Sequence, residues 1–314
     1  MKLVVLDGYA SNPGDLSWDK FNEFGHVEVY ERTKPEDVKE LIKDADAVFT
    51  NKVRLNKENL EGSNVRYIGV IATGFDIVDI NFCKEHSIVV TNVPDYSSNA
   101  VCQMVFAHLL NYTNRVDKYA SKIREGEWQN SKDFCFYLNT IHDLAGKTFG
   151  IYGYGNIGHM VEKVAEAFGM NVIVCEHNND VGGKIKSVDE FLNKSDIISL
   201  HAPLNDSSRN FVNKDNINKM KDGVIIVNTA RGPLVNEEDL NAALQSGKVQ
   251  AYLTDVLSKE PMSKPHPFEG RDDVFMTPHI AWASYESRVR LMDILYENYK
   301  KFLQGESQNV VSRW

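Results

Sequence analysis

The sequence predicts an α/β protein with two domains, each built on a doubly wound parallel β-sheet. Short apolar segments of strand length alternate with helical segments along most of the 314 residues, and this alternation is typical of parallel sheets covered by helices. A glycine-rich turn at residues 153–158 starts a second series of the same kind. The chain is long enough for two domains, so we expect residues 1–95 to form a sheet of their own.

Five strands, with helices between them, are expected in this first segment. The strands are 3–6, 27–30, 47–50, 67–70 and 88–91, and the helices include 35–43 and 78–85. Polar residues follow two strands, with Lys52 after the third and Thr73-Gly74 after the fourth. Open α/β sheets bind ligands at the carboxyl ends of strands, and a glycine-containing turn can offer backbone N–H groups to a carboxylate. An ordinary turn is an equally good interpretation of Thr73-Gly74 from spacing alone.

A long amphipathic helix is expected next. Pro94 ends the preceding pattern, and Ser97-Ser98-Asn99 are helix-capping residues. Apolar residues then recur at helical spacing from Val101 to Val116. The segment that follows, 124–145, is a polar loop that carries Trp128, Phe134, Phe136 and Tyr137. A loop of this length with so many aromatic residues is unusual for a solvated connector, so we expect it to pack against another subunit.

The most informative pattern is a strand, a Gly-x-Gly-x-x-Gly turn, a helix and a second strand that ends on an acid. The turn is Gly153-Tyr-Gly-Asn-Ile-Gly158, and the second strand, 171–175, leads to Glu176. Gly153 permits the tight turn, Gly155 lets the backbone approach a pyrophosphate, and Gly158 lets helix and strand pack closely. The helix start attracts phosphate charge. Together these features predict a dinucleotide site.

The acid at the end of the second strand bears on which dinucleotide binds. Glu176 lies about 20 residues beyond the turn, where a carboxylate accepts hydrogen bonds from a ribose diol. Its charge would repel a 2′-phosphate, and residues 177–180 supply no Arg or Lys to receive one. We therefore expect NAD in preference to NADP.

Beyond Glu176 the alternation of strands and helices resumes. Strands are expected at 196–200, 224–228, 249–254 and 274–277, and helices at 187–193, 237–246 and from 284 onwards. The strands end in polar segments that begin at His201, Thr229, Asp255 and Pro278. Carboxyl ends of parallel strands lie at one edge of the sheet, so these segments should line the cofactor crevice.

Arg231, Glu260 and His279 lie in or near these strand endings. Hydride transfer to a carbonyl needs a proton donor for the oxygen and a positive group that holds the substrate. Histidine suits the first task near neutral pH, and a neighbouring carboxylate stabilises its protonated form. Arginine suits the second task because it grips a carboxylate bidentately. Each residue alone could be an ordinary loop residue, but their combination downstream of a dinucleotide motif predicts a dehydrogenase.

Composition excludes several other classes of protein. The net charge of −9 argues against a nucleic-acid or anionic-membrane surface, and no apolar segment is long enough to span a bilayer. Cys83, Cys102, Cys135 and Cys175 are scattered without a CxxC pair. They are typical of reduced thiols, so we expect a cytoplasmic protein without a disulfide framework or a metal site.

Several motifs resemble one known family over essentially the whole chain. They are Gly153-Tyr-Gly-Asn-Ile-Gly158, Leu200-His-Ala-Pro-Leu204, Asn228-Thr-Ala-Arg-Gly232, Asp255-Val-Leu-Ser-Lys-Glu-Pro261 and Thr277-Pro-His-Ile-Ala281. The sequence is identified by them as similar to the D-isomer-specific 2-hydroxyacid dehydrogenases. Further segments resemble the NAD-dependent glycerate dehydrogenases, or hydroxypyruvate reductases, within that family. These are Thr50-Asn-Lys52, Ala72-Thr-Gly-Phe-Asp-Ile-Val-Asp79, Asn92-Val-Pro-Asp-Tyr-Ser97 and His279-Ile-Ala-Trp-Ala-Ser284.

The resemblance implies specific roles for the site residues. Arg231 would bind the substrate carboxylate and carbonyl, His279 would be the acid/base, and Glu260 would pair with His279. The Thr73 and Gly74 amides would take the carboxylate. The cofactor-binding set would be Gly153, Gly155, Asn156, Ile157, Gly158, Glu176, His201, Ala202, Pro203, Thr229, Ala230, Arg231, Asp255 and His279, with Asp255 on the nicotinamide carboxamide. The substrate-binding set would be Lys52, Thr73, Gly74, Arg231, His279 and Trp282.

The resemblance also implies an architecture. A flavodoxin-like substrate domain would comprise residues 1–97 and 286–314, because the last helix returns to it, and a Rossmann NAD-binding domain would comprise 98–285. The helix from Asn99 and the aromatic loop after it would build a homodimer.

The substrate is the least determined part of the prediction. Trp282 lies three residues after His279, where an indole would narrow the pocket and favour hydroxypyruvate or glyoxylate over bulkier acids. Alternatively, Trp282 turns away and packs against the last helix. Pyruvate or a bulkier 2-oxo acid remains open as substrate, whereas phosphoglycerate is disfavoured because Lys52 and Arg54 are the only clustered cations near the substrate loop. A further alternative is an NAD-sensing corepressor-like binding protein, because a fold does not determine a function.

Overall fold

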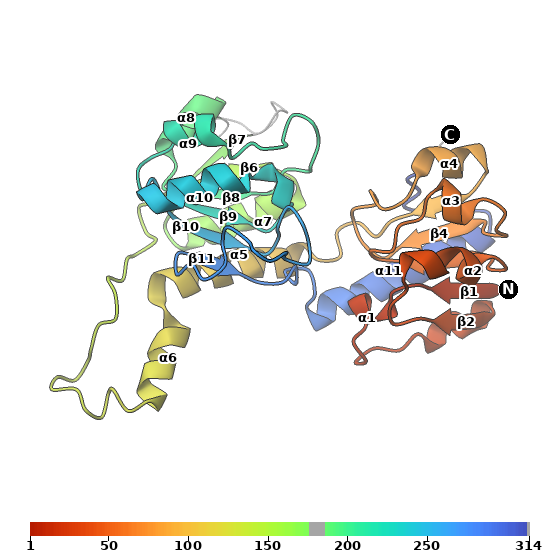
Figure 1. The fold of residues 1–314 in the computed structure, drawn as a ribbon, viewed down its shortest axis with the longest axis horizontal. Helices are drawn as coiled ribbons and strands as arrows, with labels where there is room; N and C mark the ends of the chain where they lie inside the picture. Colours follow the sequence, from red (N-terminus) through yellow and green to blue (C-terminus); the bar gives the residue numbers. More distant parts are fainter. Residues whose placement is uncertain (176–185, 313–314) are drawn as a thin grey trace. The chain divides into compact units, whose positions relative to one another are not determined.

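The computed structural model describes residues 1–175 and 186–312 and divides the chain into two compact units (Figure 1). The first unit comprises Met1–Ser97 and Ala283–Trp314, and the second comprises Ser98–Trp282. Elements of the first unit are β1 (Lys2–Val5), α1 (Gly8–Ser11), β2 (His26–Val29), α2 (Val38–Ile42), β3 (Ala47–Thr50), α3 (Lys57–Leu60), β4 (Tyr67–Val70), α4 (Ile80–Glu85), β5 (Val89–Thr91) and α11 (Tyr285–Leu303), with 3₁₀ turns at Asp19–Phe24 and Pro35–Asp37.

The second unit contains the glycine turn. Its elements are α5 (Ser98–Asn114), α6 (Val116–Arg124), β6 (Thr148–Tyr152), α7 (Asn156–Ala167), β7 (Asn171–Cys175), α8 (Val188–Lys194), β8 (Ile197–Leu200), α9 (Lys214–Lys219), β9 (Val224–Asn228), α10 (Glu237–Ser246), β10 (Val249–Thr254) and β11 (Val274–Met276), with a 3₁₀ turn at Gly232–Leu234. Both sheets are parallel throughout their described strand pairs, which confirms the predicted α/β class.

The first unit has the strand order β2-β1-β3-β4-β5, which is the flavodoxin-like order. The last helix, α11, packs against β4 of this sheet. Gly69 makes the close approach possible, because a Cβ there would lie 2.9 Å from Leu295 of the helix and 2.5 Å from Phe49. The buried ring of Tyr299 packs against that of Tyr67, with the ring centroids 4.9 Å apart and the planes tilted by 58°. Periodicity alone could not place this helix, because its apolar stripe fits any sheet face.

The second unit has the strand order β11-β10-β9-β8-β6-β7 among its described residues. The order reverses between β6 and β8. The strand that follows β6 in the sequence, β7, lies on one side of it in the sheet, and the next strand, β8, lies on its other side. In open α/β sheets ligands bind at such a reversal, outside the carboxyl ends of the strands. The glycine turn after β6 and His201 after β8 lie at this edge of the sheet.

The prediction of a single long helix through Val116 was wrong. The structure has two helices, α5 and α6, and the chain turns at Arg115, whose φ of 52° lies in the left-handed region. The Arg115 guanidinium lies 4.4 Å from the Phe275 ring centroid, which fixes the turn against the sheet. Val116 continues the apolar spacing but is 66% exposed, so it does not belong to the core stripe.

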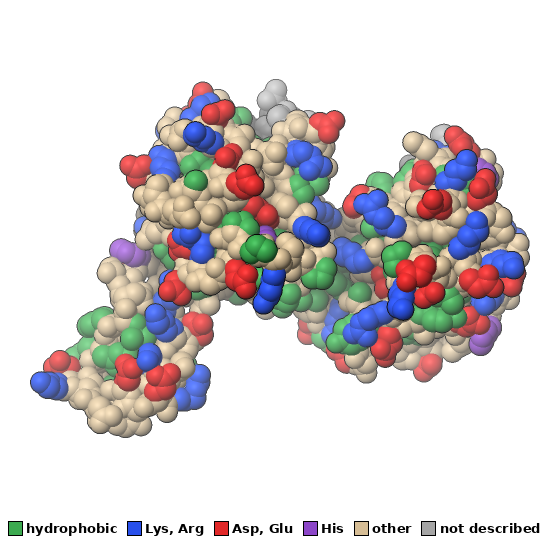
Figure 2. Space-filling view, in the orientation of Figure 1, with side chains coloured by type: hydrophobic (Ala, Val, Ile, Leu, Met, Phe, Trp, Pro, Cys, Tyr) green, Lys and Arg blue, Asp and Glu red, His purple; other side chains and the backbone are tan. Residues whose placement is uncertain are grey.

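The segment after α5 forms an arm, which we define as residues 116–143. It projects from the rest of the second unit (Figure 1). Hydrophobic side chains gather on its surface (Figure 2): Val116, Trp128, Phe134, Tyr137 and Ile141 are exposed. Phe134 and Tyr137 are 89% and 78% exposed. Within the described residues no helix is long and apolar enough to cross a membrane.

Candidate active site

The three glycines of the turn differ in what surrounds them. Gly153 has a φ of 91°, and a Cβ there would lie 2.3 Å from the backbone nitrogen of Ala202. Gly158, in the first turn of α7, would bring a Cβ within 2.7 Å of the Gly153 carbonyl oxygen. By contrast, nothing lies within 4 Å of a Cβ built on Gly155, the residue that caps α7. The turn therefore packs tightly on both sides of one open position, directly before the helix N-terminus.

Two buried polar atoms near this turn lack a partner in the described structure. They are Nδ1 of His201, after β8, and Oγ1 of Thr229, after β9. The other ring nitrogen of His201 lies 2.8 Å from Ser199 Oγ, and desolvation of the ring lowers the pKa of His201 to about 4, which keeps the ring neutral. Buried polar groups normally have hydrogen-bond partners. The open position at Gly155 and these two orphaned atoms fit a dinucleotide along the strand ends.

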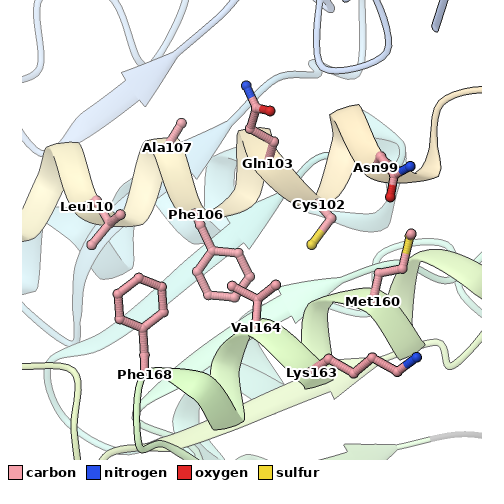
Figure 3. Close-up of a pocket in the computed structure, with 10 residues that line it drawn as sticks. All are labelled: Asn99, Cys102, Gln103, Phe106, Ala107, Leu110, Met160, Lys163, Val164 and Phe168. Carbon is pink, nitrogen blue, oxygen red and sulfur yellow. The ribbon is translucent and has the colours of Figure 1, made fainter. Parts of the chain in front are cut away.

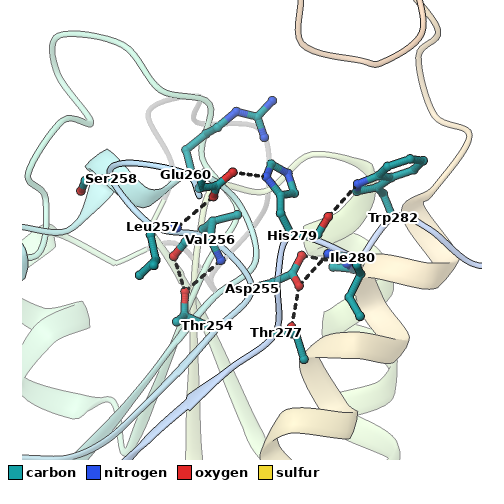
Figure 4. Close-up of polar contacts among 12 residues, drawn as sticks. Thr254, Asp255, Val256, Leu257, Ser258, Glu260, Thr277, His279, Ile280 and Trp282 are labelled. Carbon is teal, nitrogen blue, oxygen red and sulfur yellow. Dashed lines mark hydrogen bonds and ion pairs between the residues drawn. The ribbon is translucent and has the colours of Figure 1, made fainter. Parts of the chain in front are cut away.

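His279 and Glu260 form the central polar pair of the second unit (Figure 4). Nδ1 of His279 lies 2.6 Å from Oε2 of Glu260, so one ring nitrogen is oriented by the carboxylate. The other carboxylate oxygen of Glu260 accepts the Leu257 N–H at 2.9 Å. The pair is partly open to solvent, with side chains 24% and 35% exposed. Nε2 of His279 is therefore directed away from Glu260 and can transfer a proton to a bound molecule.

Asp255 organises the backbone around His279. Its Oδ1 accepts the Thr277 hydroxyl and the Ile280 N–H at 2.9 Å, and its Oδ2 accepts the Ala281 N–H at 2.7 Å. Its backbone carbonyl accepts the His279 N–H at 2.8 Å. The side chain is only 1% exposed, so its visible function is to hold this loop. A contact between Asp255 and the nicotinamide carboxamide stays a prediction.

Arg231 lies in a turn that the Asn228 side chain braces. Oδ1 of Asn228 accepts the Ala230 N–H at 3.1 Å, and its Nδ2 donates to the Arg231 carbonyl at 3.0 Å. Gly232 follows, and a Cβ there would lie 1.9 Å from the Leu257 carbonyl carbon. Only glycine lets the loop that carries Glu260 lie against the arginine turn. The sequence of each loop thus brings Arg231 and Glu260 to the same edge of the sheet.

The side chain of Trp282 lies beside His279. Its Nε1–H donates to the His279 carbonyl at 2.9 Å. In Figure 4 the imidazole of His279 points toward Glu260, whereas the indole lies on the opposite side of the His279 backbone. This hydrogen bond holds the indole beside His279. A contact between the indole and the substrate stays a prediction.

The predicted substrate residues of the first unit also follow strands of one sheet. The Thr73 hydroxyl donates to the Val93 carbonyl at 2.9 Å, and the Thr73 carbonyl accepts the Asn92 amide at 2.8 Å. Thr73 therefore shapes the turn before Gly74. The loop with Lys52 is held by Asp7, a buried carboxylate that accepts backbone N–H groups of residues 51–53. Burial raises the pKa of Asp7, and these bonds oppose the rise.

The structure brings the predicted residues together in two sets. Residues of the second unit collect at one edge of the six-stranded sheet: Gly153, Gly155, Asn156, Ile157, Gly158, His201, Ala202, Pro203, Thr229, Ala230, Arg231, Asp255, Glu260, His279 and Trp282. Lys52, Thr73 and Gly74 collect at the edge of the first sheet. Glu176 lies outside the described residues. No cluster of metal-ligating residues exists in the part of the chain that the structure describes.

Three supporting residues were not predicted from the sequence. Asp7 directly follows the first strand, and that position was the available signal for its role. Thr277 belongs to a motif, but the motif does not reveal that its hydroxyl bonds Asp255. His108 is a polar residue among apolar neighbours of α5 and lies 3.0 Å from Thr277. A histidine on an apolar helix face was the signal there, but it does not identify the partner.

The reversed strand order, the glycine turn and the histidine–carboxylate pair define a dinucleotide-dependent oxidoreductase. Comparison with known proteins agrees, because the profile of the NAD binding domain of D-isomer specific 2-hydroxyacid dehydrogenases matches residues 106–281. The chain belongs to this family.

Individual relatives extend the similarity to the whole chain. Hydroxypyruvate reductase of Blautia hydrogenotrophica is 44% identical over 322 residues, across 100% of both chains. Glycerate dehydrogenase of Methylorubrum extorquens is 35% identical, across 99% of this chain and 98% of that protein. Among solved structures, an acyclic imino acid reductase in complex with NADPH and D-Arg is 31% identical, covers 99% of this chain and 100% of its own, and has a TM-score of 0.86.

Proposed function

We propose that the protein is a hydroxypyruvate reductase that uses NADH to form D-glycerate, with glyoxylate as a second substrate. The observation that carries the proposal is the His279–Glu260 pair, joined at 2.6 Å at the strand ends of a family NAD-binding domain. The names of the two similar enzymes, hydroxypyruvate reductase and glycerate dehydrogenase, support this choice of substrate.

In this proposal each group has one task. Bound NADH supplies the hydride that reduces the carbonyl carbon of the 2-oxo acid. Protonated His279 gives its Nε2 proton to the carbonyl oxygen, and Glu260 stabilises that protonated form of the ring through Nδ1. Arg231 binds the carboxylate and polarises the carbonyl, because its guanidinium can donate two parallel hydrogen bonds. In the reverse direction His279 accepts the hydroxyl proton of D-glycerate.

We assign substrate binding to the unit Met1–Ser97 with Ala283–Trp314, and NAD binding to Ser98–Trp282. The Thr73 and Gly74 amides would receive the substrate carboxylate, because the turn offers N–H groups after β4. Lys52 and Trp282 would complete the substrate-binding set. Lys52 would contribute a positive charge, and the Trp282 indole would limit the size of the substrate.

Initial rates of NADH oxidation test the proposal. Hydroxypyruvate should have the highest kcat/KM, followed by glyoxylate, with pyruvate and phenylpyruvate well below. NADPH should be the poorer cofactor, and in the oxidative direction only the D isomer of glycerate should react. No turnover with any 2-oxo acid would contradict the proposed enzyme, whereas phenylpyruvate as the best substrate would contradict the proposed pocket.

We further propose a homodimer in which a second copy covers the arm and the α5–α7 surface. The arm exposes several large apolar side chains, as described above. Helices α5 and α7 leave a groove of about 600 Å³ between them (Figure 3), lined by apolar residues such as Phe106, Leu110, Met160, Val164 and Phe168. Exposed apolar surface of this kind marks interaction sites, and one chain supplies both a projecting apolar segment and an apolar groove.

Light scattering after size exclusion tests this assembly. The wild-type chain should have twice the chain mass, and Phe134→Asp should shift it toward the monomer. Leu303→Asp places the same charge on an exposed apolar residue of α11 and should leave the mass unchanged. A monomeric wild type, or a dimer that survives Phe134→Asp together with Trp128→Asp, would contradict the proposed interface.

The cysteines support a cytoplasmic location. Cys83, Cys102, Cys135 and Cys175 are all free thiols, and three of them are buried. Reduced thiols are typical of proteins of the cytoplasm, so we infer that the enzyme acts there.

A further inference from the structure

A buried histidine on α5 contacts the loop that carries His279. His108 is 6% exposed and lies between the buried residues Val105 and Leu109 on its helix. Its Nε2 lies 3.0 Å from Oγ1 of Thr277. Thr277 in turn contacts Asp255 at 2.5 Å between Oγ1 and Oδ1. Three polar side chains thus form a continuous chain from the helix to the carboxylate.

The chemistry of these groups sets the direction of each hydrogen bond. A carboxylate only accepts, so the single hydroxyl hydrogen of Thr277 points to Asp255. Thr277 must then accept from His108, which requires a hydrogen on Nε2 of the imidazole. Burial lowers the pKa of His108, and the negative charge of Asp255 opposes this. A neutral ring with its hydrogen on Nε2 agrees with both the hydrogen bond to Thr277 and the lowered pKa.

The end of this chain is the backbone of the active-site loop. Asp255 accepts N–H groups from Ile280 and Ala281, and its carbonyl accepts the His279 N–H. His279 has a φ of 55°, a left-handed conformation that non-glycine residues rarely adopt. Such a conformation persists only where surrounding contacts hold it. The Trp282 indole N–H holds the His279 carbonyl, and the contacts on the His279 N–H and on the two residues that follow pass through Asp255 and Thr277.

We propose that His108 is a positioning residue, which acts through Thr277 and Asp255 to hold His279 in the orientation that pairs it with Glu260. This inference rests on the proposed acid/base role of His279. His108 itself touches neither substrate nor cofactor in this arrangement. The Nε2–H of His108 restrains Thr277 in the rotamer whose hydroxyl donates to Asp255. Without this N–H, the Thr277 hydroxyl can turn away from the carboxylate.

Variants of His108 separate positioning from simple core packing. His108→Gln keeps an N–H donor at a similar reach from the backbone, whereas His108→Leu keeps the bulk and removes the donor. Thr277→Val removes the next link, and Thr277→Ser retains its hydroxyl. Thr113→Val is the matched control, because Thr113 is also buried on α5 but its hydroxyl bonds only residues of its own helix: it donates to the carbonyls of Leu109 and Leu110 and accepts from the Asn114 side chain.

The expected result is a selective loss of turnover. His108→Leu should lower kcat about tenfold or more while KM for the 2-oxo acid stays within about threefold. His108→Gln should recover most of the wild-type kcat, as should Thr277→Ser relative to Thr277→Val. The double variant His108→Leu/Thr277→Val should be little worse than the more damaging single variant, because both break the same chain. Thr113→Val should leave kcat near wild type, whatever it does to the melting temperature.

Several results would overturn the positioning role. They are an unchanged kcat in His108→Leu, a failure of Gln to restore activity in a folded variant, or additive losses in the double variant. His279→Gln, measured alongside with whichever 2-oxo acid the wild type reduces, separates this inference from the proposed function. If His279→Gln is inactive and His108→Leu is fully active, only the positioning role fails. If His279→Gln is fully active, both proposals fail.

Discussion

Alanine substitutions at two glycines of the same turn should both weaken NADH binding but should differ in their effect on stability. Gly155→Ala places its methyl group where nothing lies within 4 Å, and Gly155 has a φ of −83° that alanine adopts freely. We expect its stability to stay within about 0.5 kcal/mol of wild type. NADH affinity should nevertheless fall tenfold or more, a loss of about 1.4 kcal/mol or greater, because the methyl group occupies the space of the pyrophosphate.

Gly158→Ala is the contrasting change. Its methyl group would lie 2.7 Å from the Gly153 carbonyl oxygen, a backbone atom that the neighbouring strand end holds in place. Overpacking of this kind costs about 1–3 kcal/mol, so this variant should unfold at clearly lower denaturant concentration. Its NADH affinity should also fall, because the helix start moves away from the turn.

Urea unfolding and NADH fluorescence titration on the three proteins measure both quantities. The reasoning fails if Gly155→Ala binds NADH as tightly as wild type, or if it destabilises the fold as much as Gly158→Ala.

Three further predictions concern the remaining site residues. Arg231→Ala should lower kcat at least a hundredfold and raise KM for hydroxypyruvate. Arg231→Lys should recover little activity, because an ammonium group cannot form the bidentate contact. A near wild-type kcat of Arg231→Ala in steady-state kinetics would contradict the role assigned to Arg231. Trp282→Ala should raise kcat/KM for phenylpyruvate relative to hydroxypyruvate, and an unchanged substrate profile would show that the indole does not narrow the pocket. Burial lowers the pKa of His201 from 6.5 to about 4, so the unfolded chain binds this proton first as the pH falls. Stability should therefore drop by roughly 2 kcal/mol between pH 7 and pH 5 from this residue alone, and urea unfolding of His201→Gln should lack that part of the loss.

The parts of the fold that follow from periodicity and glycine chemistry were predictable. Each parallel strand is a short apolar segment next to a helix, and the α/β class follows from that order. The different surroundings of Gly153, Gly155 and Gly158 agree with the tasks expected of them, because a tight turn, an open backbone and a close helix contact are local properties. The strand endings with His201, Thr229 and Asp255 lie at one edge because parallel strands all end on the same side.

The break between α5 and α6 was not predictable from the apolar pattern. Val116 continues the spacing of the helix, and nothing in that spacing signals that Arg115 turns into the left-handed region. At this turn the Arg115 guanidinium contacts the ring of Phe275, which follows more than 150 residues later in the sequence. Short helices such as α3 and α9 were missed for a related reason. They are capped by Asn56 and Asn213 rather than marked by a long apolar stripe.

The difference between the acid/base pair and its support shows where sequence reasoning stops. His279 and Glu260 could be proposed because proton transfer requires polar groups that are accessible at strand ends, and both residues follow strands. Asp255 also follows a strand, and its contact with the cofactor, which the family resemblance implies, stays a prediction. The sequence does not show that its carboxylate accepts the Thr277 hydroxyl and the N–H groups of Ile280 and Ala281. His108 lies on an apolar helix face, where a histidine is usually interpreted as part of the core. Only the 3.0 Å contact with Thr277 connects it to the loop that carries His279. Which residues support a site depends on contacts that form only in the tertiary fold. Such residues are therefore found by following hydrogen bonds outward from the His279–Glu260 pair rather than by searching for motifs.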